Sequence, residues 1–155
     1  MAVLEVRKAG DSVLKRVAVP IKKVDGKIRA LLDDMADTMY KSEGIGLAAP
    51  QVGASVRAVV MDVGDGRLLE MINPEITSRE GTVIDSEGCL SVPGMFGDVE
   101  RSAKVTVAYT TRYGKRRTLD AENILARCVQ HEIDHLDGVL FIDVAKSLRQ
   151  ESTEE

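Results

Sequence analysis

The segment Gln130-His131-Glu132-Ile133-Asp134-His135-Leu136 contains both histidines of this 155-residue chain. His135 follows His131 by four positions, so on an α-helix both imidazoles lie on one face, close enough to bind the same metal ion. Glu132 stands beside the first histidine, where its carboxylate can accept a proton from a water molecule on such a metal. The pattern makes hydrolysis at a metal centre the leading hypothesis.

The histidine pair belongs to a predicted helix over residues 121–137. Asp120 is the expected N-cap of this helix, and Gly138 is the residue expected to end it. The apolar stripe of the helix consists of Ile124, Cys128, His131 and His135. Because the histidines continue an apolar stripe, we expect their side chains to point into the protein.

A second amphipathic pattern predicts a helix over residues 26–42. Asp25 is a plausible N-cap for it, and Gly44 lies just past its other end. The residues that recur at spacings of three and four are Ile28, Leu31, Leu32, Met35 and Met39. The following segment, residues 44–53, is rich in small side chains and is expected to form a loop or a tight turn.

The region between the two helices carries β-strand patterns. Asn73-Pro74 is expected to stop one strand, and Tyr113-Gly114-Lys115 is typical of a hairpin turn. The strands are expected over residues 56–63, 68–72, 82–84 and 99–109. Strands that come as a run between helices favour an α+β fold. We therefore expect antiparallel or mixed sheets around a central C-terminal metal-binding helix, with an N-terminal helix, in one domain over residues 1–155.

The composition is typical of a soluble globular protein rather than of a nucleic-acid-binding one. Hydrophobic residues make up 44% and charged residues 30%, and the net charge is −4. The basic run Lys115-Arg116-Arg117 is short and lacks interleaved aromatic residues, so we interpret it as a solvated strand end. No direct nucleic-acid site is expected.

Other features of the chain favour a cytoplasmic protein. The first eight residues contain no uninterrupted apolar stretch of the kind found in a signal peptide. No run of about 18 apolar residues exists, so a membrane span is not expected. In a reducing compartment, Cys89 and Cys128 are better read as ligands or core residues than as a disulfide.

The third metal ligand is the open question. A hydrolytic metal site usually has three protein ligands and one position for water, and with no third histidine the candidates are carboxylates and cysteines. Cys128 lies roughly 7.5 Å along the helix axis from the midpoint of the histidine pair, too far for a thiolate bond of about 2.3 Å. The same distance weakens a closed Cys₂His₂ zinc site. Cys89 stays open between a ligand and a small buried hydrophobe.

Three segments together resemble the signature motifs of the peptide deformylases. They are Gly44-Ile45-Gly46-Leu47-Ala48-Ala49-Pro50-Gln51, Glu87-Gly88-Cys89-Leu90-Ser91 and the histidine segment, in the order and at about the spacing of the family. The resemblance implies hydrolysis of the N-formyl group from the initiator methionine of new bacterial or organellar proteins, with release of formate. It also implies one divalent metal ion, with iron(II) expected and zinc or nickel able to replace it.

The resemblance also implies roles for individual residues. The metal ligands would be Cys89, His131 and His135, and Glu132 would be the general acid–base. Gln51 and the backbone N–H of Leu90 would stabilise the oxyanion. The substrate-binding residues would be Gly44, Ile45, Gly46, Ile124, Arg127 and Cys128. The expected partners are N-formyl-methionyl peptides and nascent chains.

Three features depart from the family pattern. Arg127 stands where many members have an aliphatic residue, and we consider an ion pair with Asp85 at the pocket mouth. Phe96 stands where the family often has a basic residue, which leaves the preference beyond methionine open. Only twelve residues follow Asp143, whereas many bacterial relatives carry a longer terminal helix used in part for ribosome docking. A ribosome contact is therefore a further expectation to test.

Two other functions fit parts of the pattern. Another metallohydrolase, such as a peptidase, would also carry the His-Glu-x-x-His arrangement. A non-catalytic metal- or peptide-binding module could keep the same scaffold. The presence of Gln51, Cys89 and Glu132 together argues against this second alternative.

Overall fold

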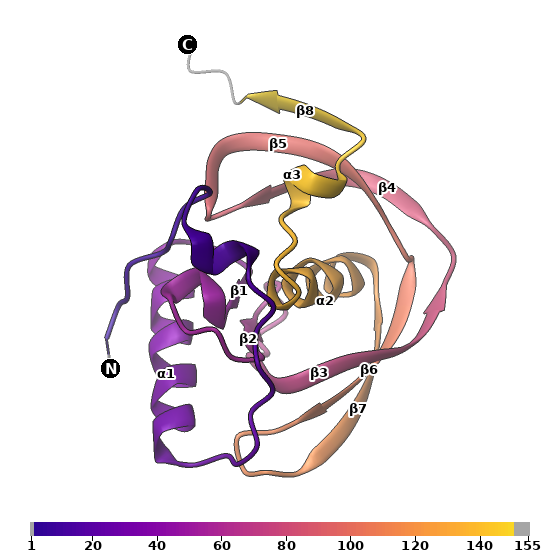
Figure 1. Cartoon of the computed structure of the whole chain (residues 1–155). Helices are drawn as coiled ribbons and strands as arrows, with labels where there is room; N and C mark the ends of the chain where they lie inside the picture. Colours follow the sequence, from indigo (N-terminus) through magenta and orange to yellow (C-terminus); the bar gives the residue numbers. More distant parts are fainter. Residues whose placement is uncertain (1, 151–155) are drawn as a thin grey trace.

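The structure is a computed structural model that describes residues 2–150 (Figure 1). Strands form two antiparallel sheets, and the predicted α+β fold is confirmed. The larger sheet has the order β1 (Gly46–Ala48), β2 (Ala58–Met61), β3 (Leu69–Glu80), β6 (Lys104–Thr110) and β7 (Arg116–Glu122). The smaller sheet has the order β4 (Val83–Cys89), β5 (Val92–Arg101) and β8 (Ser147–Gln150). The helices are η1 (Ser12–Lys15), α1 (Gly26–Lys41), η2 (Ala49–Val52), α2 (Asn123–Leu136) and α3 (Phe141–Val144).

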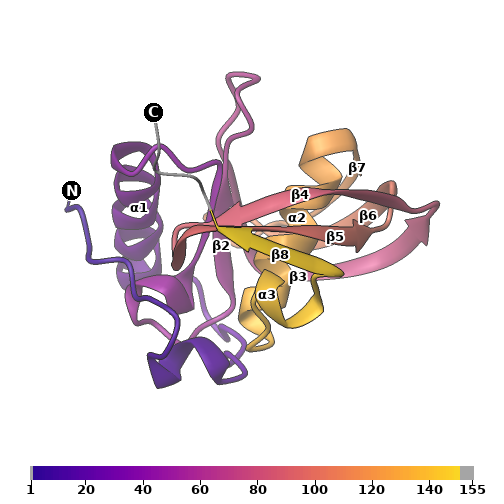
Figure 2. The ribbon, with the colours of Figure 1, turned by 90° about the horizontal axis from the view of Figure 1, so that it is seen from above.

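Helix α2 lies inside the curve formed by the strands, with the smaller sheet on one side and β3, β6 and β7 on the other (Figure 1). Seen from above, β4, β5 and β8 run side by side across α2, while α1 stands apart from them (Figure 2). The buried face of α2 packs on the larger sheet through Ala126, Val129, Ile133 and Leu136, against Val59, Met71 and Val107. This placement makes α2 the central element of the fold.

Helix α1 confirms the N-terminal amphipathic pattern. The side chain of Asp25 accepts a hydrogen bond from the backbone N–H of Ile28 at 3.1 Å, as expected of an N-cap. The inner face packs on β1 and β2 through Leu32, Met35 and Met39, which are all fully buried. Within residues 2–150, no helix is long and apolar enough to cross a membrane.

The prediction of a loop over residues 44–53 is wrong in part. Residues 46–48 pair with β2, and residues 49–52 form a 3₁₀ turn. The Gln51 side chain accepts a hydrogen bond from the backbone N–H of Ala48 at 2.9 Å. This contact stabilises the turn locally, which small-residue composition alone does not reveal.

The predicted stop at Asn73-Pro74 is also wrong, because β3 continues to Glu80. Asn73 adopts a positive φ of 50°, and the register with β6 shifts between Ile72 and Glu75. Such a bulge accommodates the missing N–H of Pro74 without ending the strand. The side chain of Asn73 bonds to both the N–H and the C=O of Ile21, which stabilises this unusual conformation.

The strand predicted over residues 99–109 is two strands in different sheets. It divides at Ser102 and Ala103, between β5 and β6. The Gln130 side chain accepts from the N–H of Ser102 and donates to its C=O, both at 2.9 Å, so α2 holds the chain where it changes sheet. The short strand predicted over residues 82–84 is likewise the start of the longer β4.

Helix α2 begins two residues later than predicted. Asp120 is not its cap but lies in β7, where it accepts a hydrogen bond from Thr106 of β6. Gly138, with φ 76°, follows the helix end as expected. The predicted stripe is buried except at Ile124, whose side chain is 53% exposed because it lies at the exposed first turn of the helix.

Candidate metal centre and its pocket

The structure brings Cys89, His131 and His135 together. Their ligand atoms all lie within 4.8 Å of one another, and Cys89 Sγ is 3.3 Å from His135 Nε2. Cys89 ends β4 and pairs with Val92, so residues 90–91 form the tight connection to β5. The hairpin end thus faces the inner side of α2, and segments 46 residues apart in sequence meet at one point.

The donor set fits a divalent metal ion. His131 Nδ1 lies 2.8 Å from Glu87 Oε1, and this hydrogen bond leaves the opposite ring nitrogen for a metal. Burial lowers the pKa of His135 well below its usual value, so this imidazole is neutral, as a ligand must be. One thiolate and two imidazoles match the ligands of four-coordinate zinc or iron sites. These three residues could therefore hold such an ion.

The pKa of the His131 imidazole results from opposing effects. Burial alone would lower its pKa, but hydrogen bonds with Cys89 and Glu87 raise the pKa to about 10. A metal on the opposite ring nitrogen would compete with that proton, so metal binding at this site should release protons.

Glu132 has an environment suited to proton transfer. Its side chain is only 4% exposed, and burial raises its pKa to about 7. Within the described part of the chain, its Oε1 atom has no hydrogen-bond partner. A carboxyl group with a pKa near neutrality can both accept and release a proton under cellular conditions.

Gln51 is a further buried polar residue next to Cys89, and it is only 1% exposed. Its Nε2 donates to Ser91 Oγ at 3.1 Å and approaches Cys89 Sγ at 3.5 Å. Its amide N–H group therefore faces Cys89, one of the three candidate ligands, while its oxygen accepts the hydrogen bond from the Ala48 N–H. Leu90 directly follows Cys89 and lines the cavity beside the same site.

A cavity of about 460 Å³ opens next to these groups. Ile45, 43% exposed, and Ile124 lie at its rim. Burial raises the pKa of the Cys128 thiol, so it stays protonated and serves as an apolar surface. All six residues predicted to bind substrate line this cavity: Gly44, Ile45, Gly46, Ile124, Arg127 and Cys128. Phe96 lines it too.

Close packing explains the two glycines of the cavity. A Cβ atom on Gly44 would lie 2.8 Å from Leu90 Cδ1. A Cβ atom on Gly46 would collide with the Glu132 carboxylate and lie 2.8 Å from Cys128 Sγ. Larger side chains at either position would push into the cavity or displace its lining.

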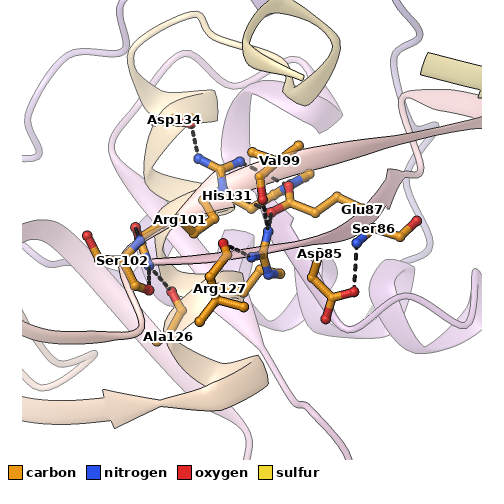
Figure 3. Close-up of polar contacts among 12 residues, drawn as sticks. Asp85, Ser86, Glu87, Val99, Arg101, Ser102, Ala126, Arg127, His131 and Asp134 are labelled. Carbon is orange, nitrogen blue, oxygen red and sulfur yellow. Dashed lines mark hydrogen bonds and ion pairs between the residues drawn. The ribbon is translucent and has the colours of Figure 1, made fainter. Parts of the chain in front are cut away.

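The proposed ion pair between Asp85 and Arg127 is wrong. Arg127 instead donates to Glu87 Oε2 at 2.6 Å, and Asp85 accepts from the backbone N–H of Ser86 (Figure 3). Arg127 points along β4 toward a buried carboxylate rather than outward to water, because that carboxylate offers a desolvated partner.

Glu87 is the functional residue that sequence reasoning missed. Burial opposes its ionisation, but hydrogen bonds from His131 and Arg101 outweigh burial and lower its pKa to about 2. Arg101 also donates to Asp134 at 2.5 Å, beside His135 (Figure 3). The signal was available: Glu87 lies two positions before Cys89, and strand periodicity places alternate residues on one face.

Comparisons with known proteins agree with one another. The family model described as polypeptide deformylase matches residues 3–151. A peptide deformylase from Carboxydothermus hydrogenoformans is 54% identical over 148 residues, which is 96% of this chain and 97% of that protein. The crystal structure of a peptide deformylase from Thermotoga maritima has 42% identity and a TM-score of 0.92, covering 95% of this chain and 100% of that one. A peptide deformylase from Synechococcus elongatus in complex with actinonin has 43% identity and a TM-score of 0.90, covering 93% and 79%.

Proposed function

The chain belongs to the polypeptide deformylase family of metal-dependent enzymes that remove N-formyl groups, and from this membership we propose how its own residues perform that reaction. The proposed substrate is the N-formyl-methionyl end of a newly made protein, and the products are formate and a free amino terminus. The supporting observation is the cluster of Cys89, His131 and His135 beside Glu132 at an apolar cavity.

Cys89, His131 and His135 are proposed to hold one divalent ion, iron(II) in the cell, with zinc or nickel as substitutes. When bound, such an ion supplies a Lewis acid that makes water a nucleophile near neutral pH. The thiolate donates more charge than an imidazole, which favours a soft ion. Glu87 orients His131 by holding its Nδ1 proton, so the ring presents its other nitrogen to the ion.

Glu132 is the proposed general acid–base. It would take the proton from the attacking water and deliver it to the departing amine nitrogen. Its pKa of about 7 and its unpaired Oε1 support this role, because the group can change protonation state at little cost. Burial also keeps bulk water from competing for the proton.

Gln51 and the backbone N–H of Leu90 are proposed to stabilise the negative charge that develops on the formyl oxygen. Gln51 is held in place before the reaction by its bonds to Ala48 and Ser91. Donors fixed in advance lower the barrier without reorganisation, and loss of one typically costs about 10²–10³ in rate.

The methionine side chain is proposed to enter the cavity lined by Ile45, Ile124 and Cys128, with the stem of Arg127 as part of the wall. Gly44 and Gly46 allow the chain to pack closely against Leu90, Glu132 and Cys128, which keeps this part of the cavity lining in place. An unbranched, flexible thioether suits an apolar cavity of irregular shape.

For the cellular setting, we propose one catalytic domain over residues 1–155, acting on nascent chains in a bacterial-type cytoplasm or an organelle. The match of the family model to residues 3–151 supports one domain. A ribosome contact is proposed as well, and co-sedimentation of the purified protein with ribosomes tests it. The last five residues of the sequence lie outside the described ones.

The test is an anaerobic formate-release assay with iron(II), zinc or nickel restored to metal-free protein. A formyl-Met peptide should release formate, whereas acetyl-Met and free-amine peptides of the same sequence should not be cleaved. Actinonin, which the Synechococcus elongatus relative binds, should suppress the reaction. Cleavage of the free-amine peptide without formate release would instead favour a peptidase and contradict the proposal.

A further inference from the structure

Arg127 connects three elements around the candidate metal centre. It lies on α2, one turn before His131. Its NH2 donates to the C=O of Val83 in β4 at 2.8 Å, and its NH1 donates to the C=O of Val99 in β5 at 2.9 Å (Figure 3). The same NH1 donates to Glu87 at 2.6 Å. The Arg127 guanidinium thus joins α2, which carries both histidines, to β4 and β5, the strands of the hairpin whose turn follows Cys89.

Glu87, the target of Arg127, has its hydrogen-bonding capacity filled. Oε1 accepts from Arg101 NH2 at 3.0 Å and from His131 Nδ1 at 2.8 Å. Oε2 accepts from Arg101 Nε at 2.9 Å and from Arg127 NH1. Arg101 approaches the carboxylate as a fork in one plane, and Arg127 approaches from the helix side. The two arginines together therefore fix both the position and the tilt of the group that His131 contacts.

Ion pairs connect the two arginines to the carboxylates of this cluster. The cations Arg101 and Arg127 are matched by the carboxylates of Glu87 and Asp134. Removing the Arg127 guanidinium would take one of the two donors from Oε2 of Glu87, whose side chain is only 4% exposed. Buried carboxylates that lose a partner are costly, so Glu87 would shift toward its remaining donors. Such a shift would weaken its bond to His131.

We propose that Arg127 is a positioning residue that acts through Glu87 on His131 and thereby strengthens metal binding. The proposal rests on the metal site of the proposed function. This role differs from the substrate-binding role that the sequence predicts for Arg127. The guanidinium would position the ligand His131 through Glu87, while the aliphatic part of the side chain belongs to the proposed cavity wall. Loss of such an outer contact typically weakens metal binding about 10- to 100-fold.

The experiment compares Arg127→Met with Arg127→Lys. Methionine keeps an apolar stem in the cavity wall and removes the charge and the donors. Lysine keeps the charge but cannot reproduce the fork that bonds to Glu87 and both carbonyls. Arg79→Met is the matched control, since Arg79 also donates to an α2 side chain, Gln130, but has no bond to Glu87.

The readout is anaerobic titration of metal-free protein with cobalt(II), followed by visible absorption. The dissociation constant should rise about 10- to 100-fold for Arg127→Met, by less for Arg127→Lys, and not for Arg79→Met. Circular dichroism verifies folding of each variant, and if the methionine variant does not fold, the lysine variant decides. Wild-type cobalt affinity in a folded Arg127 variant would overturn the proposal.

A double-mutant cycle tests whether Arg127 acts through Glu87. If it does, Arg127→Met should weaken cobalt binding much less in a Glu87→Gln background than in the wild type. Equal losses in both backgrounds would overturn the proposed route. Failure of the wild type to release formate would contradict the proposed function yet leave the cobalt affinities as a separate result.

Discussion

Gly46 and Glu132 are packed so tightly that a single methyl group at position 46 would collide with the carboxylate. Gly46 begins β1, and Glu132 lies in the middle of α2. The absence of a side chain in β1 thus limits where the proposed acid–base group of α2 can lie. This contact joins a motif of small residues to the histidine segment far along the chain.

Gly46→Ala should reduce formate release strongly, because the methyl group displaces the Glu132 carboxylate. Overpacking of this kind costs about 1–3 kcal/mol of stability, so the variant should still fold. Steady-state kinetics and urea unfolding measure the two effects. Gly26→Ala is the control, since a Cβ atom there meets nothing within 4 Å. Wild-type kcat in Gly46→Ala would mean that Glu132 has more room than the structure gives it.

Glu132→Gln should lower kcat for formyl-Met peptides by about 10²–10⁴, the usual contribution of a positioned acid–base group. Its shape is kept, so metal content should remain equal to that of the wild type, as measured by elemental analysis. Glu122→Gln, an exposed position at the start of α2, provides the matched control. Undiminished formate release by Glu132→Gln would assign proton transfer to another group.

The Gln51→Glu substitution tests the donor role of the Gln51 amide separately from its role as an acceptor in the turn. A carboxylate still accepts from the Ala48 N–H, which preserves the turn, but it removes the amide donor that faces the metal site. The added negative charge also opposes an oxyanion, so kcat should fall by at least about 10². Because Gln51 is 1% exposed, the new carboxylate also costs stability, so circular dichroism verifies that the variant is folded under the assay conditions. Equal activity of the variant and the wild type would exclude Gln51 from oxyanion stabilisation.

Asp143 should contribute stability that depends on pH. Partial burial opposes its ionisation, but hydrogen bonds from Lys15 and from the Leu140 N–H outweigh burial and hold its pKa below 3.8. A lowered folded-state pKa gives stability that is complete above 3.8 and is lost as the pH falls through the folded-state value.

Asp143→Asn should therefore lower the free energy of unfolding at pH 7 by no more than about 1 kcal/mol, because the pair is partly exposed. The difference from the wild type should shrink below pH 3.8. Urea unfolding at pH 7, 5 and 3 measures it, with Glu5→Gln as the control, since Glu5 is exposed and its side chain has no ion pair with the described residues. A difference that stays constant across this range would show that the charge of Asp143 contributes nothing.

The elements that local sequence decides were predicted well. Periodic apolar residues and the Asp25 cap identify α1, and the spacing of His131 and His135 identifies the inner face of α2. These features depend on contacts within a few residues, where helix geometry alone sets which side chains share a face.

The features that sequence reasoning missed depend on contacts between distant segments. The division of β5 from β6 depends on Gln130 bonding to Ser102, and the continuation of β3 depends on a bulge at Asn73. Glu87 gains its role only when Arg101 and Arg127, from two other elements, reach the same carboxylate. Strand alternation indicates that Glu87 shares a face with Cys89, but no local propensity identifies these distant partners.

The long separation between Cys89 and His135 has a consequence for how the protein holds together. An ion bound by both residues would close a loop of 46 residues and tie the β4–β5 hairpin to α2 as a removable cross-link. By the loop-entropy relation used for disulfides, such a closure is worth about 4 kcal/mol. The metal ion would then stabilise the fold as well as take part in the reaction. In cells short of metal, the protein would be less stable and would be cleaved more readily by proteases.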